Sequence, residues 1–151
     1  MRHVGYGHMI KTAIFDFDGT LADTIPLCLE AFRRAVNDLD GRVLTDREIE
    51  RNFGPDDLGV IRKLFPGKPE WHEHGRELFI HYYQELHAEM APAPFPGTVE
   101  LLHSLRNSGI RLAMVTGKRR ESADISLKFF HLDGFFPVLE TGSPEGGVKT
   151  D

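Results

Sequence analysis

The sequence has a single cysteine, Cys28, among its 151 residues, so it cannot form an internal disulfide. It has no basic tract, and its formal net charge of −5 disfavours nucleic acid as a partner. No apolar run approaches the length of a membrane span, and residues 1–11 contain no apolar signal core. These absences predict a cytoplasmic protein in a reducing compartment, with no membrane partner.

Several common enzyme signatures are also missing. The sequence contains no Walker loop, no Gly-x-Gly-x-x-Gly and no Gly-x-Ser-x-Gly, which disfavours triphosphatases, dinucleotide-dependent dehydrogenases and serine hydrolases. It is rich in histidine between residues 72 and 103, but without a His-Glu-x-x-His motif or a second cysteine. We therefore assign to helix surfaces the residues His72, His74, His81, His87 and His103.

The most informative stretch is residues 11–24, which read KTAIFDFDGTLADT. The short apolar run at residues 13–15 predicts a buried strand that ends in a pair of carboxylates. Because Asp16 and Asp18 are two residues apart, their side chains share one face if the strand persists. Gly19 then allows the backbone to turn away. The pair therefore lies at the carboxyl end of a strand, where open α/β sheets bind ligands.

Two neighbouring carboxylates repel each other unless one is protonated or a hard cation lies between them. Mg²⁺ fits this role because it prefers oxygen ligands and often bridges to phosphate. A carboxylate beside Mg²⁺ can attack phosphorus and form an aspartyl-phosphate, while the second acts as general acid and base. A calcium loop counted from Asp16 is excluded, because Leu21 and Leu27 occupy its glycine and glutamate positions. An ordinary Asp-Gly turn after a strand stays open.

The remaining pattern alternates helices with further strands. Residues 23–91 are predicted to form a helical bundle of four helices, near 25–39, 45–53, 56–65 and 69–90. The longest of these helices is expected to bury a stripe made of Trp71, Leu78, Tyr82, Leu86 and Met90. A proline-rich linker, residues 91–97, leads back to a core with strands near 12–16, 110–115 and 136–140. Strands alternating with helices predict a parallel sheet.

A second polar position closes the strand at residues 110–115. The hydroxyl of Thr116 and the N–H of Gly117 are placed to donate to a phosphoryl oxygen near the start of a helix. Taken alone, Thr-Gly after a strand is a common turn. Beside the Asp16–Asp18 pair, the phosphate-binding interpretation is favoured.

The complete string at residues 15–24 resembles the first motif of the haloacid dehalogenase-like hydrolases, and residues 115–117 are similar to the second. Lys149 stands where these proteins carry their third motif, although Thr150 replaces the proline that often follows. The resemblance implies a Rossmann-like parallel sheet with an inserted helical cap. The core would comprise residues 1–22 and 92–151 and the cap residues 23–91, as in the phosphoglycolate phosphatase-like branch.

The resemblance also implies roles for individual residues. Asp16 is the expected nucleophile and Asp18 the general acid/base, with Mg²⁺ on the Asp16 carboxylate and the backbone carbonyl of Asp18. Lys149 is expected to offset the charge of aspartate and phosphate. Further phosphate contacts are expected from Gly19, Thr20, Thr116 and Gly117. The cap residues Asn52 and Gly54 are expected to meet the substrate.

The sequence therefore predicts a magnesium-dependent phosphatase for a small phosphorylated metabolite. A pyrophosphatase, a phosphonatase and a sugar phosphomutase stay open within the same branch. So does a truncated phosphate-binding or regulatory remnant, because the family's fourth motif, an acidic cluster, does not appear before Asp151. With about three core strands, residues 13–15 would form an exposed sheet edge, and we expect weak magnesium binding and self-association.

Overall fold

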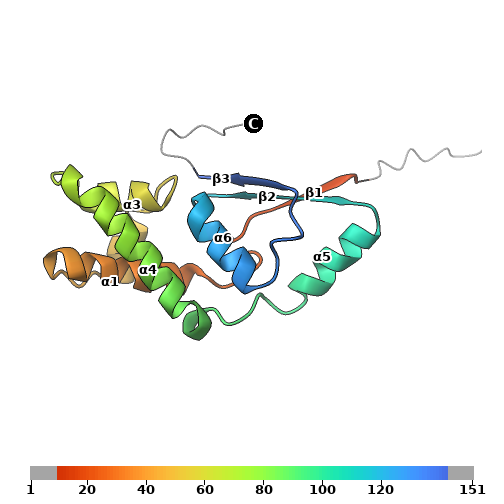
Figure 1. The fold of residues 1–151 in the computed structure, drawn as a ribbon, viewed down its shortest axis with the longest axis horizontal. Helices are drawn as coiled ribbons and strands as arrows, with labels where there is room; N and C mark the ends of the chain where they lie inside the picture. Colours follow the sequence, from red (N-terminus) through yellow and green to blue (C-terminus); the bar gives the residue numbers. More distant parts are fainter. Residues whose placement is uncertain (1–9, 143–151) are drawn as a thin grey trace, which may run out of the picture.

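The computed structural model describes residues 10–142. The chain begins with one strand, continues through a largely helical stretch and then alternates helices with strands (Figure 1). The elements in chain order are β1 (Thr12–Phe15), α1 (Ile25–Asp40), α2 (Asp46–Glu50), α3 (Asp57–Leu64), the 3₁₀ helix η1 (Pro69–Trp71), α4 (His72–Met90), α5 (Thr98–Asn107), β2 (Arg111–Thr116), α6 (Arg120–Phe129) and β3 (Val138–Thr141).

The three strands form one parallel sheet in the order β1-β2-β3. Ile14 of β1 lies opposite Ala113 of β2, which lies opposite Val138 of β3. Helix α5 leads into β2 and α6 leads into β3, because parallel neighbours require a crossover connection. The predicted α/β class and the three strands are therefore confirmed, and β1 forms one edge of the sheet, as expected.

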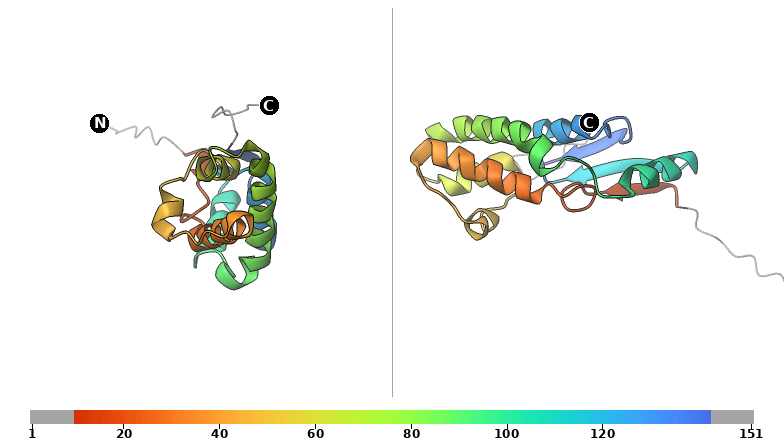
Figure 2. Two further views of the ribbon diagram at one scale, coloured as in Figure 1. Left: turned by 90° about the vertical axis from the view of Figure 1, so that its left-hand side faces the viewer. Right: turned by 90° about the horizontal axis from the view of Figure 1, so that it is seen from below.

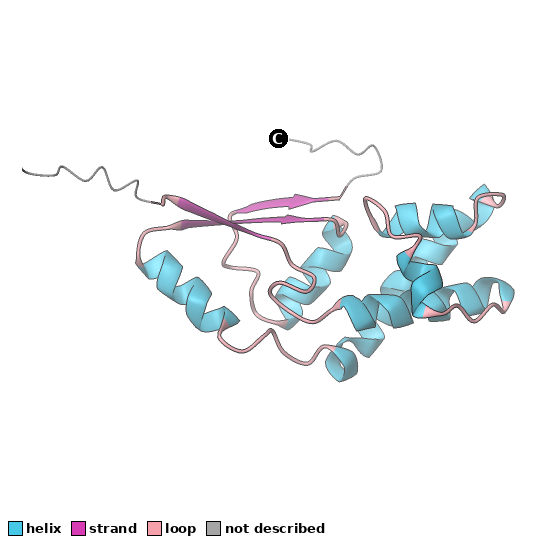
Figure 3. Cartoon of the chain, turned by 180° about the vertical axis from the view of Figure 1, so that it is seen from behind, coloured by secondary structure: helices cyan, strands magenta, loops and turns pink. Residues whose placement is uncertain are grey.

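The two faces of this sheet differ. Helices α5 and α6 lie on the same side of the strands (Figures 1 and 3). On the opposite face, Ile14, Val115 and Val138 are 65%, 48% and 52% exposed. The register places these three side chains on one face, because alternate residues of a strand point the same way. The described residues thus leave an apolar sheet face uncovered.

Helices α1, α3 and α4 pack together beside the carboxyl ends of the strands (Figures 1 and 2). Helix α1 runs along α4, with the rings of Phe32 and Phe79 stacked 4.1 Å apart. Gly41, at φ 77°, ends α1, and the predicted capping box of Thr45 and Glu48 starts α2. The domain boundaries at residues 22/23 and 91/92 stay predictions. Within residues 10–142, none of the helices is long and apolar enough to cross a membrane.

The predicted stripe of α4 is correct at Leu86, which is 5% exposed, but its centre is displaced by one residue. The other four predicted residues are partly buried and pack against the core: Trp71, Leu78, Tyr82 and Met90. The fully buried aromatic side chains are Phe79 and Tyr83, next in sequence to the predicted Leu78 and Tyr82. One residue turns the stripe by about 100° around the helix axis. His87 is also buried rather than exposed, 1% exposed. The reason lies outside α4, because α6 supplies hydrogen bonds that a polar side chain needs when it is buried.

Candidate active site

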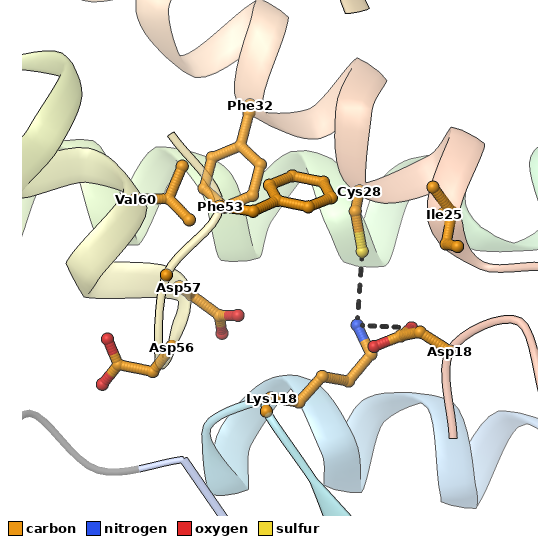
Figure 4. A pocket seen from close by; sticks show the side chains of 11 residues that line it. Asp18, Ile25, Cys28, Phe32, Phe53, Asp56, Asp57, Val60 and Lys118 are labelled. Atoms are coloured by element: carbon orange, nitrogen blue, oxygen red, sulfur yellow. Dashed lines mark hydrogen bonds and ion pairs between the residues drawn. The ribbon is translucent and has the colours of Figure 1, made fainter. Parts of the chain in front are cut away.

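Three loops meet at the carboxyl end of the sheet and enclose a cavity of about 250 Å³ (Figure 4). Two of them follow β1 and β2, and the third joins α2 to α3. The core wall of this cavity consists of Asp18, Gly117 and Lys118. The helical wall consists of Ile25, Cys28, Phe32, Phe53, Gly54, Asp56, Asp57 and Val60.

The loop after β1 presents the two predicted carboxylates differently. Phe17 is completely buried, while Asp16 before it is exposed and Asp18 after it is half-buried. Gly19, at φ 72°, turns the chain, and its N–H donates to the Ala22 carbonyl over 2.8 Å. The sequence therefore exposes one carboxylate and brings the other into the cavity.

Hydrogen bonds hold each carboxylate in place. One Asp16 oxygen, Oδ1, accepts from the backbone N–H of Phe17 over 2.7 Å. Oδ1 of Asp18 accepts from the hydroxyl of Thr24, which is completely buried, and lies 3.2 Å from Nζ of Lys118. Two donors thus fix the orientation of Asp18, whereas Oδ2 of Asp16 has no hydrogen bond from the described residues.

Lys118 is the residue that the sequence analysis missed. Its side chain is 3% exposed, and Nζ lies 3.2 Å from Asp18, 3.3 Å from Sγ of Cys28 and 4.3 Å from the ring centre of Tyr83. The sequence feature that could have indicated Lys118 is its position two residues after Thr116, the last residue of β2. This position brings a cation to the same end of the sheet as the carboxylates of Asp16 and Asp18.

The electrostatics of the cavity keep Lys118 charged. Burial acts to lower the pKa of Lys118, but the surrounding negative groups outweigh it and raise that pKa well above its ordinary value. Burial also raises the pKa of Cys28 to about 12, so its thiol is protonated at neutral pH. The Asp18 carboxylate, 3.2 Å from Nζ, is then the charge that stabilises the ammonium group.

The helical wall contributes two further acids from the start of α3. Asp56 caps α3 by accepting the Gly59 N–H over 2.6 Å, and its Oδ2 lies 3.3 Å from Nη1 of Arg119. Asp57 accepts the Ser122 hydroxyl over 2.6 Å, and burial raises the pKa of its carboxyl group. These contacts tie α3 to the start of α6. The sequence predicted a helix that starts near Asp56 and a stretch, residues 51–56, that faces the substrate, but it did not distinguish Asp57.

The two predicted cap contacts separate in the structure. Gly54 lines the cavity, as expected of a substrate contact. Asn52 does not line it, because its side-chain amide donates to the Glu48 carbonyl over 2.8 Å at the end of α2. Phe53, 41% exposed, supplies the side chain that faces the cavity in this loop (Figure 4).

The predicted phosphate contacts lie on the two strand-end loops. Thr116 is 6% exposed, and its hydroxyl oxygen accepts the Lys118 N–H over 3.3 Å, which leaves its own hydrogen free to donate. Gly117 is exposed and lines the cavity. The N–H of Thr20 donates to the Phe17 carbonyl over 3.1 Å, so its hydroxyl is the group free for a ligand. Lys149 lies outside the described residues.

The carboxylates suit a hard cation only in part. Exposed Asp16 offers the oxygen ligand that Mg²⁺ prefers, two residues from Asp18. Asp18 is partly neutralised by Lys118. Between residues 10 and 142, no group of three or more His, Cys, Asp or Glu side chains is placed to hold a metal. Among the described residues, Asp16 and Asp18 are thus the carboxylates that could contribute to a Mg²⁺ site.

Comparison with known proteins agrees with this geometry. The family described as haloacid dehalogenase-like hydrolase matches residues 13–151, which includes both strand-end loops. The chain belongs to this family. The family predicted from the sequence is thereby confirmed.

Curated relatives of this family member include pyrophosphatases and a kinase. Pyrophosphatase PpaX of Halalkalibacterium halodurans is 31% identical over 86% of this chain and 59% of that protein. A putative PpaX of Caldanaerobacter subterraneus is 33% identical over 86% and 57%. Tyrosine-protein kinase PtkA of Mycobacterium tuberculosis is 30% identical over 96% and 50%. The chain thus spans between half and three fifths of the length of these relatives.

Solved structures of the family share the fold. CbbY from Rhodobacter sphaeroides, solved in complex with phosphate, has a TM-score of 0.77 at 23% identity, over 93% of this chain and 67% of that chain. A predicted phosphoglycolate phosphatase from Haemophilus somnus has a TM-score of 0.74 at 22% identity, over 93% and 66%. These likenesses confirm the Rossmann-like α/β fold class.

Proposed function

We propose that the chain carries the phosphoryl-transfer site of a magnesium-dependent phosphatase that acts on a small phosphorylated metabolite. One observation carries the proposal: exposed Asp16 follows β1 two residues before Asp18, which is paired with buried Lys118 in a small cavity. Membership of a hydrolase family and the phosphatase names among its relatives support it.

In the proposed reaction, an Asp16 carboxylate oxygen attacks phosphorus and the bond from phosphorus to the ester oxygen breaks. Asp18 takes up a proton from solvent on Oδ2, while Oδ1 keeps its contacts with Thr24 and Lys118, and gives that proton to the departing alcohol oxygen. A water molecule then attacks the aspartyl-phosphate, and Asp18 takes the proton from that water. Inorganic phosphate leaves, and the Asp16 carboxylate is restored.

The surrounding donors are suited to a phosphoryl group. The hydroxyls of Thr20 and Thr116 and the exposed Gly117 are proposed phosphate contacts, with Gly19 shaping the loop. Lys118 supplies positive charge in the cavity. Lys149 is proposed to add a second cation. Asp16 and Asp18 would hold Mg²⁺, which when bound offsets the negative charge of the phosphoryl oxygens.

Replacing the nucleophile tests this proposal. Asp16→Asn removes the attacking carboxylate, and we expect phosphate release from small esters to fall by at least about a thousandfold. Asp133→Asn is a matched control, because it removes an exposed carboxylate near the opposite end of the sheet. Release by Asp16→Asn at the control's rate, in the presence of Mg²⁺, would reject Asp16 as the nucleophile.

A phosphate-binding or regulatory protein with little turnover is the second candidate. The observation that favours it is that residues 10–142 show no cluster of three metal-ligating side chains. It predicts weak binding of Mg²⁺ in calorimetry and binding of inorganic phosphate without turnover of any ester. Brisk turnover of any ester would exclude it.

Two further expectations concern the chain's surroundings. The uncovered sheet face around Ile14, Val115 and Val138 is proposed to favour self-association, since exposed apolar patches promote contacts. Light scattering over a range of concentrations measures this, and a monomer at every concentration would contradict it. The cytoplasmic location stays a prediction from the single cysteine.

A further inference from the structure

The two ends of the cavity carry different charges. Lys118 and Asp18 stand at one end, where the phosphoryl group is proposed to bind (Figure 4). At the other end, the start of α3 brings in Asp56 and Asp57, which are 3% and 7% exposed. A leaving group that extends from the phosphoryl position into the cavity therefore meets carboxylates.

Asp57 is the less compensated of these two acids. Among the described residues, its one hydrogen bond comes from the Ser122 hydroxyl to Oδ2, and no cation lies within ion-pair distance. Its side chain faces the cavity in Figure 4. Asp56, by contrast, is paired with Arg119 at 3.3 Å and bonded to the α3 backbone. Burial raises the pKa of this carboxyl group, and a cationic ligand beside it would favour the ionised form and be bound by it.

The charge balance of the whole site also favours a cationic group on the substrate. Three acids line the cavity, Asp18, Asp56 and Asp57, and the cations Lys118 and Arg119 pair with the first two. Bound Mg²⁺ would offset part of the negative charge, and a phosphoryl group restores it. A second anionic group on the substrate would then lie beside Asp57, which has no ion pair with the described residues, and such like-charge contacts are costly in a buried site.

The rest of the helical wall limits the size and nature of the leaving group. Phe32 is buried and Phe53 is 41% exposed, and both rings line the cavity with Val60. The volume of about 250 Å³ admits a compact group. A short carbon chain against these rings would place its far end near Asp57.

We infer that the substrate is the phosphate ester of a small amino alcohol, whose ammonium group binds Asp57, rather than pyrophosphate or an ester with a carboxylate. This inference rests on the proposed phosphatase function. It sets this chain apart from its PpaX relatives, whose name states that they are pyrophosphatases. Asp57 is then a residue that determines specificity, and its contact with Ser122 positions it.

A series of matched probes tests the inference on the purified protein with Mg²⁺. The three esters, 2-aminoethyl, ethyl and carboxymethyl phosphate, have a cationic, an uncharged and an anionic alcohol part respectively. Inorganic pyrophosphate, an anhydride with an anionic leaving group, is the fourth probe. We expect kcat/KM to be at least about tenfold higher for the aminoethyl ester than for the carboxymethyl ester or pyrophosphate. Ethyl phosphate should fall between them.

The variant Asp57→Asn keeps the shape and the Ser122 contact but removes the charge. The aminoethyl-to-carboxymethyl ratio should fall by about tenfold, whereas Asp133→Asn should leave it unchanged. A merely structural role for Asp57 would lower both rates together and keep the ratio. An equal ratio in wild type and variant, or faster turnover of carboxymethyl phosphate or pyrophosphate in wild type, overturns the inference while the phosphatase function stands. Turnover of none of the probes or of other small esters overturns both.

Discussion

The two walls of the cavity are held in place by different means. The core wall, Asp18, Gly117 and Lys118, follows the ends of paired strands, so the register of β1 and β2 fixes where it stands. The helical wall's acids, Asp56 and Asp57, are fixed instead by long-range contacts to Arg119 and Ser122. The backbone topology thus positions the core-wall residues, which are proposed to take part in the reaction. A few side-chain contacts position Asp56 and Asp57, the acids of the wall proposed to select the substrate.

The largest predicted effect removes the cation of the core wall. Lys118→Met leaves Asp18 without its ion pair and Asp57 without its nearest compensating charge. We expect the free energy of unfolding to fall by about 3 kcal/mol, as when one partner of a buried pair is removed. Urea unfolding measures this. Lys128→Met, at an exposed site on α6, should change stability by less than about 0.5 kcal/mol, and equal losses in the two variants would contradict the role of Lys118.

A smaller effect is expected where the two walls approach each other. Gly142 donates its N–H to the Lys118 carbonyl over 2.7 Å, and a Cβ there would overlap the carbonyl oxygens of Gly117 and Pro55. Gly142→Ala must therefore displace the loop that carries Pro55, and we expect a loss of about 2 kcal/mol in thermal unfolding. The control Gly134→Ala places its methyl group in open space. Unchanged stability in Gly142→Ala would mean that the two walls lie farther apart.

The smallest effect concerns pH and the buried contact between α4 and α6. His87 Nε2 lies 2.9 Å from the Ser126 hydroxyl, which also bonds Tyr83, and Nδ1 is buried without a hydrogen bond from the described residues. Burial lowers the pKa of His87. Its folded pKa is then below the unfolded value of about 6.5, so stability should fall as pH drops through that value.

The variant His87→Gln should reduce this dependence of unfolding free energy on pH between about pH 8 and pH 5. His81→Gln removes an exposed histidine of the same helix and should leave most of the slope intact. Because burial raises the pKa of Asp57, that group contributes with the opposite sign, and the comparison is between variants rather than with wild type alone. Equal slopes in His87→Gln and wild type would contradict the assignment.

The sequence predicted the features that depend on local patterns and missed those that depend on long-range contacts. Asp16 and Asp18, with Thr116 and Gly117, were found because local patterns mark the ends of strands. Lys118 and Asp57 were missed, because what distinguishes them is burial beside residues distant in sequence. The parallel direction of the strands followed from the alternation of helices and strands, whereas their order comes from the structure.

The errors on α4 have the same origin. Tyr83 and His87 could be buried only because Ser126, on a helix some forty residues later, bonds both. The spacing of apolar residues within α4 does not indicate that Ser126 is a partner. Asn52 was placed in the cavity for a related reason, since the pattern could not show that its amide caps α2.

The central claim is that Asp16 itself becomes phosphorylated, and trapping that species is its most direct test. Wild type and Asp18→Asn would be mixed with 2-aminoethyl phosphate and Mg²⁺, quenched in acid and digested, and the peptide containing Asp16 weighed by mass spectrometry. We predict one added phosphoryl group on that peptide in wild type and none in Asp16→Asn. In Asp18→Asn the group should appear and disappear more slowly, because Asp18 serves both steps. Phosphate release without any adduct on Asp16, or an adduct on another residue, would contradict the account.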